Sequence, residues 1–228
     1  MSQPTAPFAD AAAIGNYAER TARLVPGVHD LQKMAAVLVA ERAPEFARVL
    51  VIGAGGGMEL KALAQSHPAW RFVGVDPSRP MLDLAQATLG LLADRVELHH
   101  GYTDTAPPGP FDAATCLLTL HFLNVEQRRA TLKEIHRRLK PGASLVVAHL
   151  SFPQEPVEER RLWLSRYVAF AVASGVDADS VRKAAETIES TLVLLGPEQE
   201  ESMLRETGFK APRLFYAGLA FRGWVAQT

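Results

Sequence analysis

Short apolar runs alternate with amphipathic stretches through the first two thirds of the chain. Five runs rich in β-branched residues have the length of buried strands: Val49–Ile52, Phe72–Val75, Val96–His99, Ala113–Leu118 and Ser144–Ala148. Helical spacing of apolar residues precedes or separates these runs at His29–Arg42, Gly57–Ser66, Pro80–Leu92 and Glu126–Leu139. Strands and helices that alternate in this way predict a parallel sheet with helices on both faces.

The pattern changes after the fifth strand. Pro156–Ser190 keeps helical periodicity with one break at Ser174–Ser180, which predicts a helical insertion rather than another strand–helix unit. A further helix is expected at Pro197–Thr207. The tail "RLFYAGLAFRGWVAQ" then predicts an antiparallel strand pair that turns at Ala217–Gly218.

Composition narrows the class of protein. A length of 228 residues suits one α/β domain, and a net charge of −1 gives no basic excess of the kind that marks nucleic-acid binding. The single Cys116 excludes an internal disulfide framework and suits a reducing compartment. No apolar run reaches the roughly 18 residues of a membrane span, and the N-terminus lacks a signal-peptide pattern. We therefore expect a cytoplasmic protein without a membrane segment.

Four glycines interrupt the stretch "RVLVIGAGGGMEL" between the first strand and its helix. Glycines let the backbone turn sharply and let a cofactor approach the peptide groups, and the next helix offers its N-terminal N–H groups. A dinucleotide loop, Gly-x-Gly-x-x-Gly, would need glycine where Met58 stands. The glycines that fit are Gly53, Gly55 and Gly57, at every second position, which favours a methyltransferase loop over that of a nicotinamide dehydrogenase.

Asp76 ends the second strand, roughly twenty residues beyond the glycine loop, where a carboxylate can accept both ribose hydroxyl protons of an adenosine. The alternative is a helix N-terminal Asp that precedes Pro77. An NAD site would use the same acid, so Asp76 indicates a nucleoside cofactor without choosing between the two classes.

These motifs resemble the class I S-adenosyl-L-methionine (SAM)-dependent methyltransferases. The resemblance is carried by "VLVIGAGGG", "VGVDPSRPML", "HGYTDTAP", "FDAATCLLTLHFL" and "LKPGASLVVAHL", which cover most of residues 47–150 in the family's order. It implies an α/β, Rossmann-like fold: a seven-stranded, mostly parallel sheet with helices on both faces, an antiparallel last strand and a helical insertion after strand five. We expect a single domain over residues 1–228, divided into an N-terminal helical cap (1–46), a SAM-binding core (47–150), an insertion or lid (151–195) and a last helix with the hairpin (196–228).

The resemblance also implies a SAM site, with S-adenosylhomocysteine (SAH) as product and no metal. Val51 departs from the family, because many members carry there an acid that supports the amino end of the methionine. Tyr102 stands where an acid often lies near the adenine, which moves the expected contact to Thr103 and Asp104. The cofactor contacts expected in full are Gly53, Ala54, Gly55, Gly57, Asp76, Pro77, Met81, Thr103, Asp104, Leu117 and Arg23.

Candidate catalytic residues are few, because methyl transfer mainly needs the acceptor aligned with the methyl group. His121 follows the fourth strand, where it can act as a base, position the acceptor or cap the next helix. Tyr17 lies on the N-terminal segment that closes over SAM in the resembling enzymes. Arg23, on the same segment, offers a bidentate match to the methionine carboxylate or forms a surface salt bridge with Glu19 or Asp30.

The insertion carries Trp163, Tyr167 and Phe170 at helical spacing. This aromatic stripe packs on the sheet or on another subunit, or it lines a pocket for a small organic acceptor. If the stripe packs on another subunit, we expect a homodimer.

A narrower resemblance exists to the bacterial carboxy-SAM synthase of tRNA wobble-uridine modification. It rests on "RLVPGVHDL", "LTLHFL" and "LFYAGLAFRGWVA". In that synthase an arginine of the insertion holds the extra carboxylate, and Ala185 stands at this place here, with Arg182 and Lys183 nearby. This favours plain SAM as the cofactor.

We therefore expect a SAM-dependent methyltransferase that acts on a small molecule, with tRNA as a less favoured acceptor. Two alternatives stay open: a carboxy-SAM synthase-like enzyme of tRNA modification, and a non-catalytic SAM-binding partner protein. The sequence names neither the acceptor nor the atom that is methylated.

Overall fold

The computed structural model describes residues 16–228, so residues 1–15 of the predicted cap lie outside the described part. Seven strands form one sheet in the order β3-β2-β1-β4-β5-β7-β6. Strands β1 to β5 are parallel, and β7 runs antiparallel to both β5 and β6. The Rossmann-like sheet with an antiparallel last strand is thereby confirmed. The strands are β1 Arg48–Ile52, β2 Arg71–Asp76, β3 Val96–His100, β4 Phe111–Leu117, β5 Leu139–Leu150, β6 Lys210–Gly218 and β7 Phe221–Gln227.

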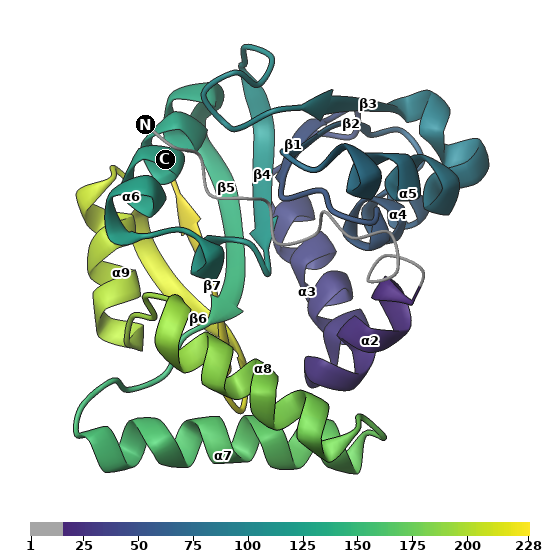
Figure 1. The fold of residues 1–228 in the computed structure, drawn as a ribbon. Coiled ribbons are helices and arrows are strands. Elements are labelled where there is room, and N and C mark those ends of the chain that lie inside the picture. The colour runs from purple at the N-terminus through teal and green to yellow at the C-terminus, as the bar shows by residue number, and fades with distance from the viewer. Residues whose placement is uncertain (1–15) are drawn as a thin grey trace.

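Helices cover both faces of this sheet, and a helical pair lies beyond the carboxyl ends of the parallel strands (Figure 1). The pair, α7 and α8, is the predicted insertion, and its break falls between Ala173 and Ala178. The α-helices are α2 Tyr17–Leu24, α3 Val28–Ala40, α4 Met58–Ser66, α5 Arg79–Leu89, α6 Val125–Arg138, α7 Val157–Ala173, α8 Ala178–Thr191 and α9 Pro197–Glu206; two short 3₁₀ turns, η1 Gly90–Arg95 and η2 Leu120–Phe122, complete the set.

Two apolar cores form on opposite faces of the sheet, because successive side chains of a strand point to opposite sides. In β1, Val49 and Val51 face one core with α3 and α4, whereas Leu50 and Ile52 face the other with α6 and α9. All four side chains are almost completely buried. A parallel strand that is buried on both faces reads as a continuous apolar run, which is why the sequence identified these strands.

The C-terminal hairpin turns one pair of residues later than predicted. Strand β6 continues through Ala217 and Gly218, and Leu219, with a φ of 52°, lies in the turn before β7. Gly218 serves a close approach instead, since a Cβ there would lie 2.3 Å from the hydroxyl of Tyr216. That hydroxyl donates a hydrogen bond to the carbonyl of Pro26 at 2.5 Å and so joins the hairpin to the segment before α3.

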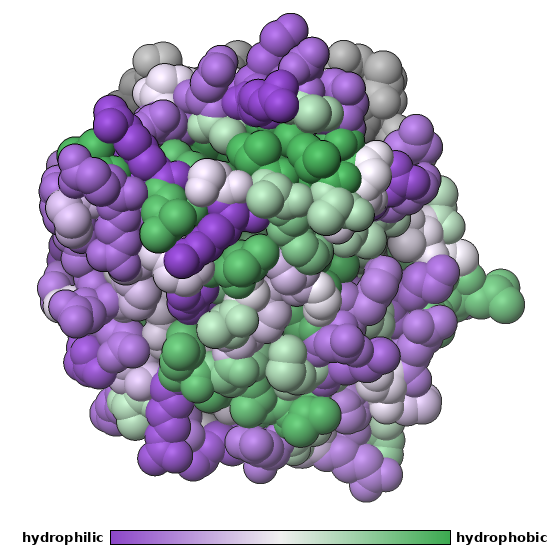
Figure 2. Space-filling model, turned by 90° about the horizontal axis from the view of Figure 1, so that it is seen from below, coloured by the Kyte–Doolittle hydropathy of each residue, from purple (hydrophilic) through white to green (hydrophobic). Residues whose placement is uncertain are grey.

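The aromatic stripe of α7 packs inward on the hairpin. Tyr167 is buried with its ring 6.2 Å from that of Phe221, and the guanidinium of Arg222 lies 5.0 Å from the centre of the Trp163 ring. The face of the molecule that carries α7 shows apolar residues in several patches separated by polar ones (Figure 2). A homodimer through this face stays a prediction. Within residues 16–228 none of the helices combines the length and the apolar character needed to cross a bilayer.

A buried guanidinium joins the insertion and the last helix to the core. Arg128 of α6 has no exposed surface, and its Nη1 lies 2.6 Å from Oε1 of Glu200 on α9. Its Nε and Nη2 donate to the carbonyls of Leu123 and Val193, at 3.0 and 2.5 Å. His149 of β5 approaches the same oxygen, with Nε2 3.0 Å from Glu200 Oε1. Three regions far apart in the sequence, residues 123–128, residue 149 and residues 193–200, therefore meet at one ion pair.

Replacing Arg128 by alanine should lower the free energy of unfolding by roughly 3–5 kcal/mol, because the substitution leaves the Glu200 carboxylate buried without its cation. The neighbouring Arg129, which pairs with Glu206 at the surface, is the matched control. The free energy of unfolding of the Arg129→Ala variant should fall by at most about 1 kcal/mol, since both partners are exposed. Urea unfolding of the three proteins measures both values, and equal losses would contradict the role given to Arg128.

Candidate functional site

A cavity of about 490 Å³ opens at the carboxyl ends of β1, β2 and β4. Ligands of open α/β sheets bind at this edge, where the strand order reverses. A second cavity of about 30 Å³ adjoins it, and the two share Tyr17, Gly53, Leu117 and Leu118. The large cavity is lined by Tyr17, Ile52, Gly53, Gly55, Val75, Asp76, Pro77, Ser78, Met81, Gly101, Tyr102, Thr103, Leu117, Leu118, Thr119, Phe122, Leu123, Thr131, Thr191 and Leu192.

The glycine loop passes between elements that leave no room for side chains. The amides of Gly53 and Ala54 both donate to the carbonyl of Val75, at 2.8 and 3.0 Å, and hold the loop against β2. Gly53 has a φ of 73°, and a Cβ there would lie 1.8 Å from the Thr119 hydroxyl oxygen. A Cβ on Gly57 would come within 2.8 Å of the Ala85 backbone. The spacing of the glycines is thus set partly by packing and partly by the open cavity beside Gly53 and Gly55.

Asp76 links the two loops that border the cavity. Its Oδ2 accepts the amide of Gly55 at 2.9 Å, and its Oδ1 accepts the amide of Ser78 at 2.8 Å. Burial raises the pKa of Asp76, and the two backbone hydrogen bonds oppose that rise. A carboxylate has about four acceptor positions, of which these bonds take two. Each oxygen keeps a lone pair that can accept a hydroxyl proton from a ligand in the cavity.

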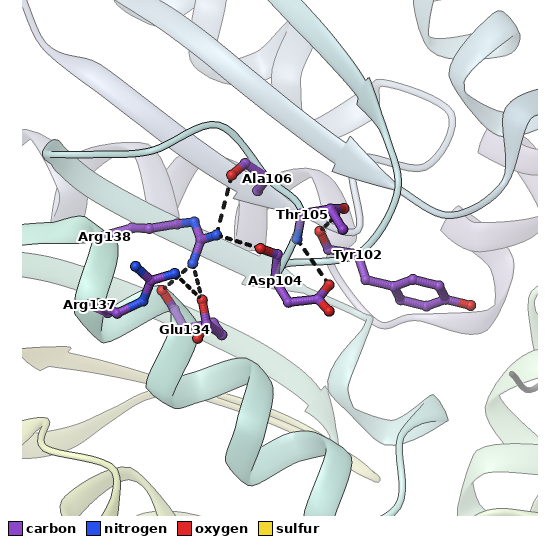
Figure 3. A network of polar contacts seen from close by, with 7 residues as sticks. All are labelled: Tyr102, Asp104, Thr105, Ala106, Glu134, Arg137 and Arg138. Atoms are coloured by element: carbon purple, nitrogen blue, oxygen red, sulfur yellow. Dashed lines mark hydrogen bonds and ion pairs between the residues drawn. The ribbon is translucent and has the colours of Figure 1, made fainter. Parts of the chain in front are cut away.

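Arg138 holds the loop after β3 in place, where the sequence predicts the contacts to adenine (Figure 3). Arg138, buried at the end of α6, donates from Nη2 to the carbonyls of Asp104 and Ala106, at 2.9 and 3.2 Å, while its Nη1 pairs with Glu134. Thr103 lines the cavity. The Asp104 carboxylate accepts the amide of Thr105 at 2.9 Å and does not line the cavity.

The structure brings together most of the residues expected at the cofactor site. The expected residues that line the large cavity are Tyr17, Gly53, Gly55, Asp76, Pro77, Met81, Thr103 and Leu117. Ala54 lines the small cavity beside them, whereas Gly57 and Asp104 line neither. The expected contacts therefore converge from β1, β2, β4 and α2 on one place.

Arg23 and His121 lie outside both cavities. Arg23 pairs with Glu19 on the exposed side of α2, in the surface salt bridge that was the alternative reading, and donates to the carbonyl of Gly175 at 3.4 Å. His121 is the buried middle residue of η2, and its Nδ1 has no hydrogen-bond partner within the described residues. Burial lowers the pKa of His121 well below its usual range, with His149 and Arg128 adding to the effect, so its imidazole is neutral.

The large cavity is also lined by residues that the sequence did not reveal. Phe122 and Leu123 come from η2 and its exit, Thr131 from α6, and Thr191 and Leu192 from the end of α8. None of them carries a charge. Thr191 and Leu192 reach the cavity because of the direction in which α8 ends. The hydrophobic periodicity of the sequence does not predict that direction.

Comparisons with known proteins agree with this geometry. Residues 49–142 match the model of a methyltransferase domain. The chain is 30% identical over 210 residues to a carboxy-S-adenosyl-L-methionine synthase from Chromohalobacter salexigens, which covers 90% of this chain and 77% of the relative.

Solved structures share the fold. The mitomycin 7-O-methyltransferase superposes with a TM-score of 0.61 at 18% identity, over 87% of this chain and 54% of that one. Human N-acetylserotonin methyltransferase in complex with SAM superposes with a TM-score of 0.60 at 15% identity, over 96% of this chain and 59% of that one. The chain spans a little more than half the length of these two proteins. From the matched domain, the relative aligned over 90% of this chain and the shared fold together, the chain belongs to the class I SAM-dependent methyltransferase family, whose cofactor is SAM.

Proposed function

We propose that the protein transfers the methyl group of SAM to a small, uncharged organic acceptor. The observation that carries this proposal is the uncharged part of the wall of the large cavity that Phe122, Leu123, Thr131, Thr191 and Leu192 form. A cavity of about 490 Å³ falls within the range of small-molecule sites, and a mainly apolar wall with a few hydroxyls favours an organic acceptor over a charged one.

In the proposed complex, Asp76 binds the ribose hydroxyls and Thr103 lies beside the adenine. Pro77 and Met81 border the adenosine, and Gly53, Gly55 and Leu117 border the methionine end. SAM supplies a methyl group activated by its sulfonium. The chain then has to align the acceptor with that group and exclude water, for which a well-oriented site suffices.

Neither candidate catalytic residue is suited to remove a proton at neutral pH. Burial raises the pKa of Tyr17, so its hydroxyl stays protonated and can donate a hydrogen bond at the boundary between the two cavities. His121 is neutral but lies outside both cavities. Positioning by Tyr17 and the neutral wall therefore accounts for the reaction better than general-base catalysis does.

Carboxy-SAM synthesis is the second candidate, because the 30% identical relative carries that name. Binding an additional carboxylate would need a cation in the site. Asp76 is the only charged side chain among the described residues that line the large cavity, and residues 1–15 contain no Arg, Lys or His. Ala185 packs against the apolar core, and Arg182 pairs with Asp179 at the surface. The neutral lining thus favours methyl transfer with plain SAM.

SAH should stabilise the purified protein. At a SAH concentration of about 100 times the dissociation constant, the free energy of unfolding should rise by roughly 2.7 kcal/mol. This corresponds to a rise in Tm of about 5–10 °C for a domain of this size. Thermal denaturation with and without SAH measures the shift. An unchanged Tm would argue against the cofactor site.

The nucleoside ligand released from the purified protein separates the two candidate reactions. We expect SAM or SAH, because no described side chain of the cavity can neutralise a second carboxylate. Mass spectrometry of the supernatant after denaturation distinguishes SAM and SAH from carboxy-SAM, which is heavier than SAM by one CO₂ unit. Recovery of carboxy-SAM would overturn the preference for plain SAM.

A Thr191→Trp substitution should obstruct the acceptor end of the cavity and leave the cofactor end intact. We expect SAH affinity to stay within about twofold, while methyl transfer to a panel of neutral aromatic and hydroxylated acceptors falls by roughly 100-fold, the loss typical of a misplaced reactant. Thr187→Trp, one turn earlier on an exposed part of α8, is the matched control. Equal activity of the two variants would show that the acceptor binds elsewhere.

A further inference from the structure

The small cavity contains an acidic group that the reaction as described does not use. Glu59, the second residue of α4, is 6% exposed and lines this cavity, and its Oε1 has no hydrogen-bond partner within residues 16–228. A buried carboxylate oxygen without a partner is costly, and such atoms normally accept a hydrogen bond or lie beside a cation. The Oε1 atom of Glu59 is therefore a candidate contact for a ligand.

No cation of the described chain fills that role. The cavity is lined by Tyr17, Thr21, Val28, Leu31, Gln32, Gly53, Ala54, Gly56, Met58, Glu59, Leu117 and Leu118, which include no Arg, Lys or His. The titratable groups that interact electrostatically with Glu59 are the Tyr17 hydroxyl from α2 and the Cys116 thiol, which lies on the other face of β4; burial raises the pKa of both, and the Glu59 charge raises both further. Both stay neutral, and residues 1–15 contain no basic side chain.

The position of the small cavity identifies the cofactor as the source of a cation. Gly53, Leu117, Leu118 and Tyr17 form its boundary with the large cavity. Asp76 lies at the end of β2, whereas Glu59 lies toward β1 and β4, near Thr115, the residue paired with Val51 across the two strands. A volume of about 30 Å³ accommodates a group the size of a water molecule. The ammonium of SAM has this size, carries a positive charge and donates three hydrogen bonds.

We propose that the Glu59 carboxylate binds the ammonium group of SAM and thereby supplies the acid that Val51 does not. This inference rests on SAM as the cofactor and is independent of the acceptor. Glu59 lies in the first turn of α4, and this helix packs on the same face of the sheet as Val51. An acid in that turn also interacts favourably with the positive end of the helix dipole.

The protonation state of Glu59 should change when the cofactor binds. Burial raises the pKa of Glu59 to about 8, against a smaller opposing effect of the Thr115 hydroxyl. At pH 7 the free carboxyl is therefore mainly protonated, and an ammonium beside it favours the ionised form. SAH binding at pH 7 should release a proton from Glu59, and the affinity should rise with pH up to about 8 and then level off.

The test compares Glu59→Gln with the wild-type protein in calorimetric titrations against SAH and against the SAH analogue that lacks only the amino group. We expect Glu59→Gln to bind SAH at least about tenfold more weakly, as is typical for the loss of a charge-assisted hydrogen bond. Both proteins should bind the deaminated analogue equally. Titrations in buffers of different ionisation enthalpy should show proton release with the wild-type protein and none with the variant.

Glu97→Gln, an acid-to-amide exchange on the exposed side of β3, serves as the control and should match the wild-type protein in every titration. The Tm of Glu59→Gln should not fall, because glutamine resembles the protonated carboxyl of the free protein. Unchanged SAH affinity in this variant, or equal losses for SAH and the deaminated analogue, would overturn the role of Glu59. A wild-type protein that binds no SAH would overturn the cofactor assignment, and this inference with it.

Discussion

One buried ion pair, between Arg128 and Glu200, determines how the C-terminal third of the chain meets the sheet. A guanidinium removed from water needs several acceptors, and here they come from α9, from the exit of η2 and from the segment after α8. These are the same segments that bring Leu123 and Leu192 to the wall of the large cavity. The shape of this wall therefore follows from an electrostatic requirement in the core.

The cofactor end is organised differently, through backbone groups. The Val75 carbonyl and the Asp76 carboxylate together accept four loop amides, so the loops after β1 and β2 are held before a ligand arrives. Arg138 does the same for the loop after β3 by donating to two of its carbonyls. A site whose backbone is already ordered loses little conformational entropy when it binds, which favours affinity for the nucleoside.

The described lining of the large cavity does not fit the reaction for which a 30% identical relative is named. That relative is a carboxy-SAM synthase, yet the large cavity offers no cation for a second carboxylate within the described residues. Charge is concentrated instead at two acids, Asp76 and Glu59, which border the two cavities. Both suit groups of SAM itself, hydroxyls in one case and an ammonium in the other. In the proposed reaction, shape and apolar contact bind the acceptor and select it by size.

Periodicity and glycine spacing were enough to predict the strands, the helical insertion and the loop around Gly53, because these features depend on local backbone preferences and on burial of alternate residues. Asp76 was found in the same way, as an acid at a strand end. The roles of other side chains depend on partners remote in sequence: Arg23 pairs with Glu19 at the surface, His121 is enclosed by packing, and Gly218 serves the Tyr216 hydroxyl rather than the turn. In the sequence, Glu59 is one residue of the predicted helix Gly57–Ser66, with nothing to mark it. Only the structure shows that its carboxylate is enclosed between α2, α3 and β4 without a cation among the described residues, since burial and pairing are properties of the assembled fold.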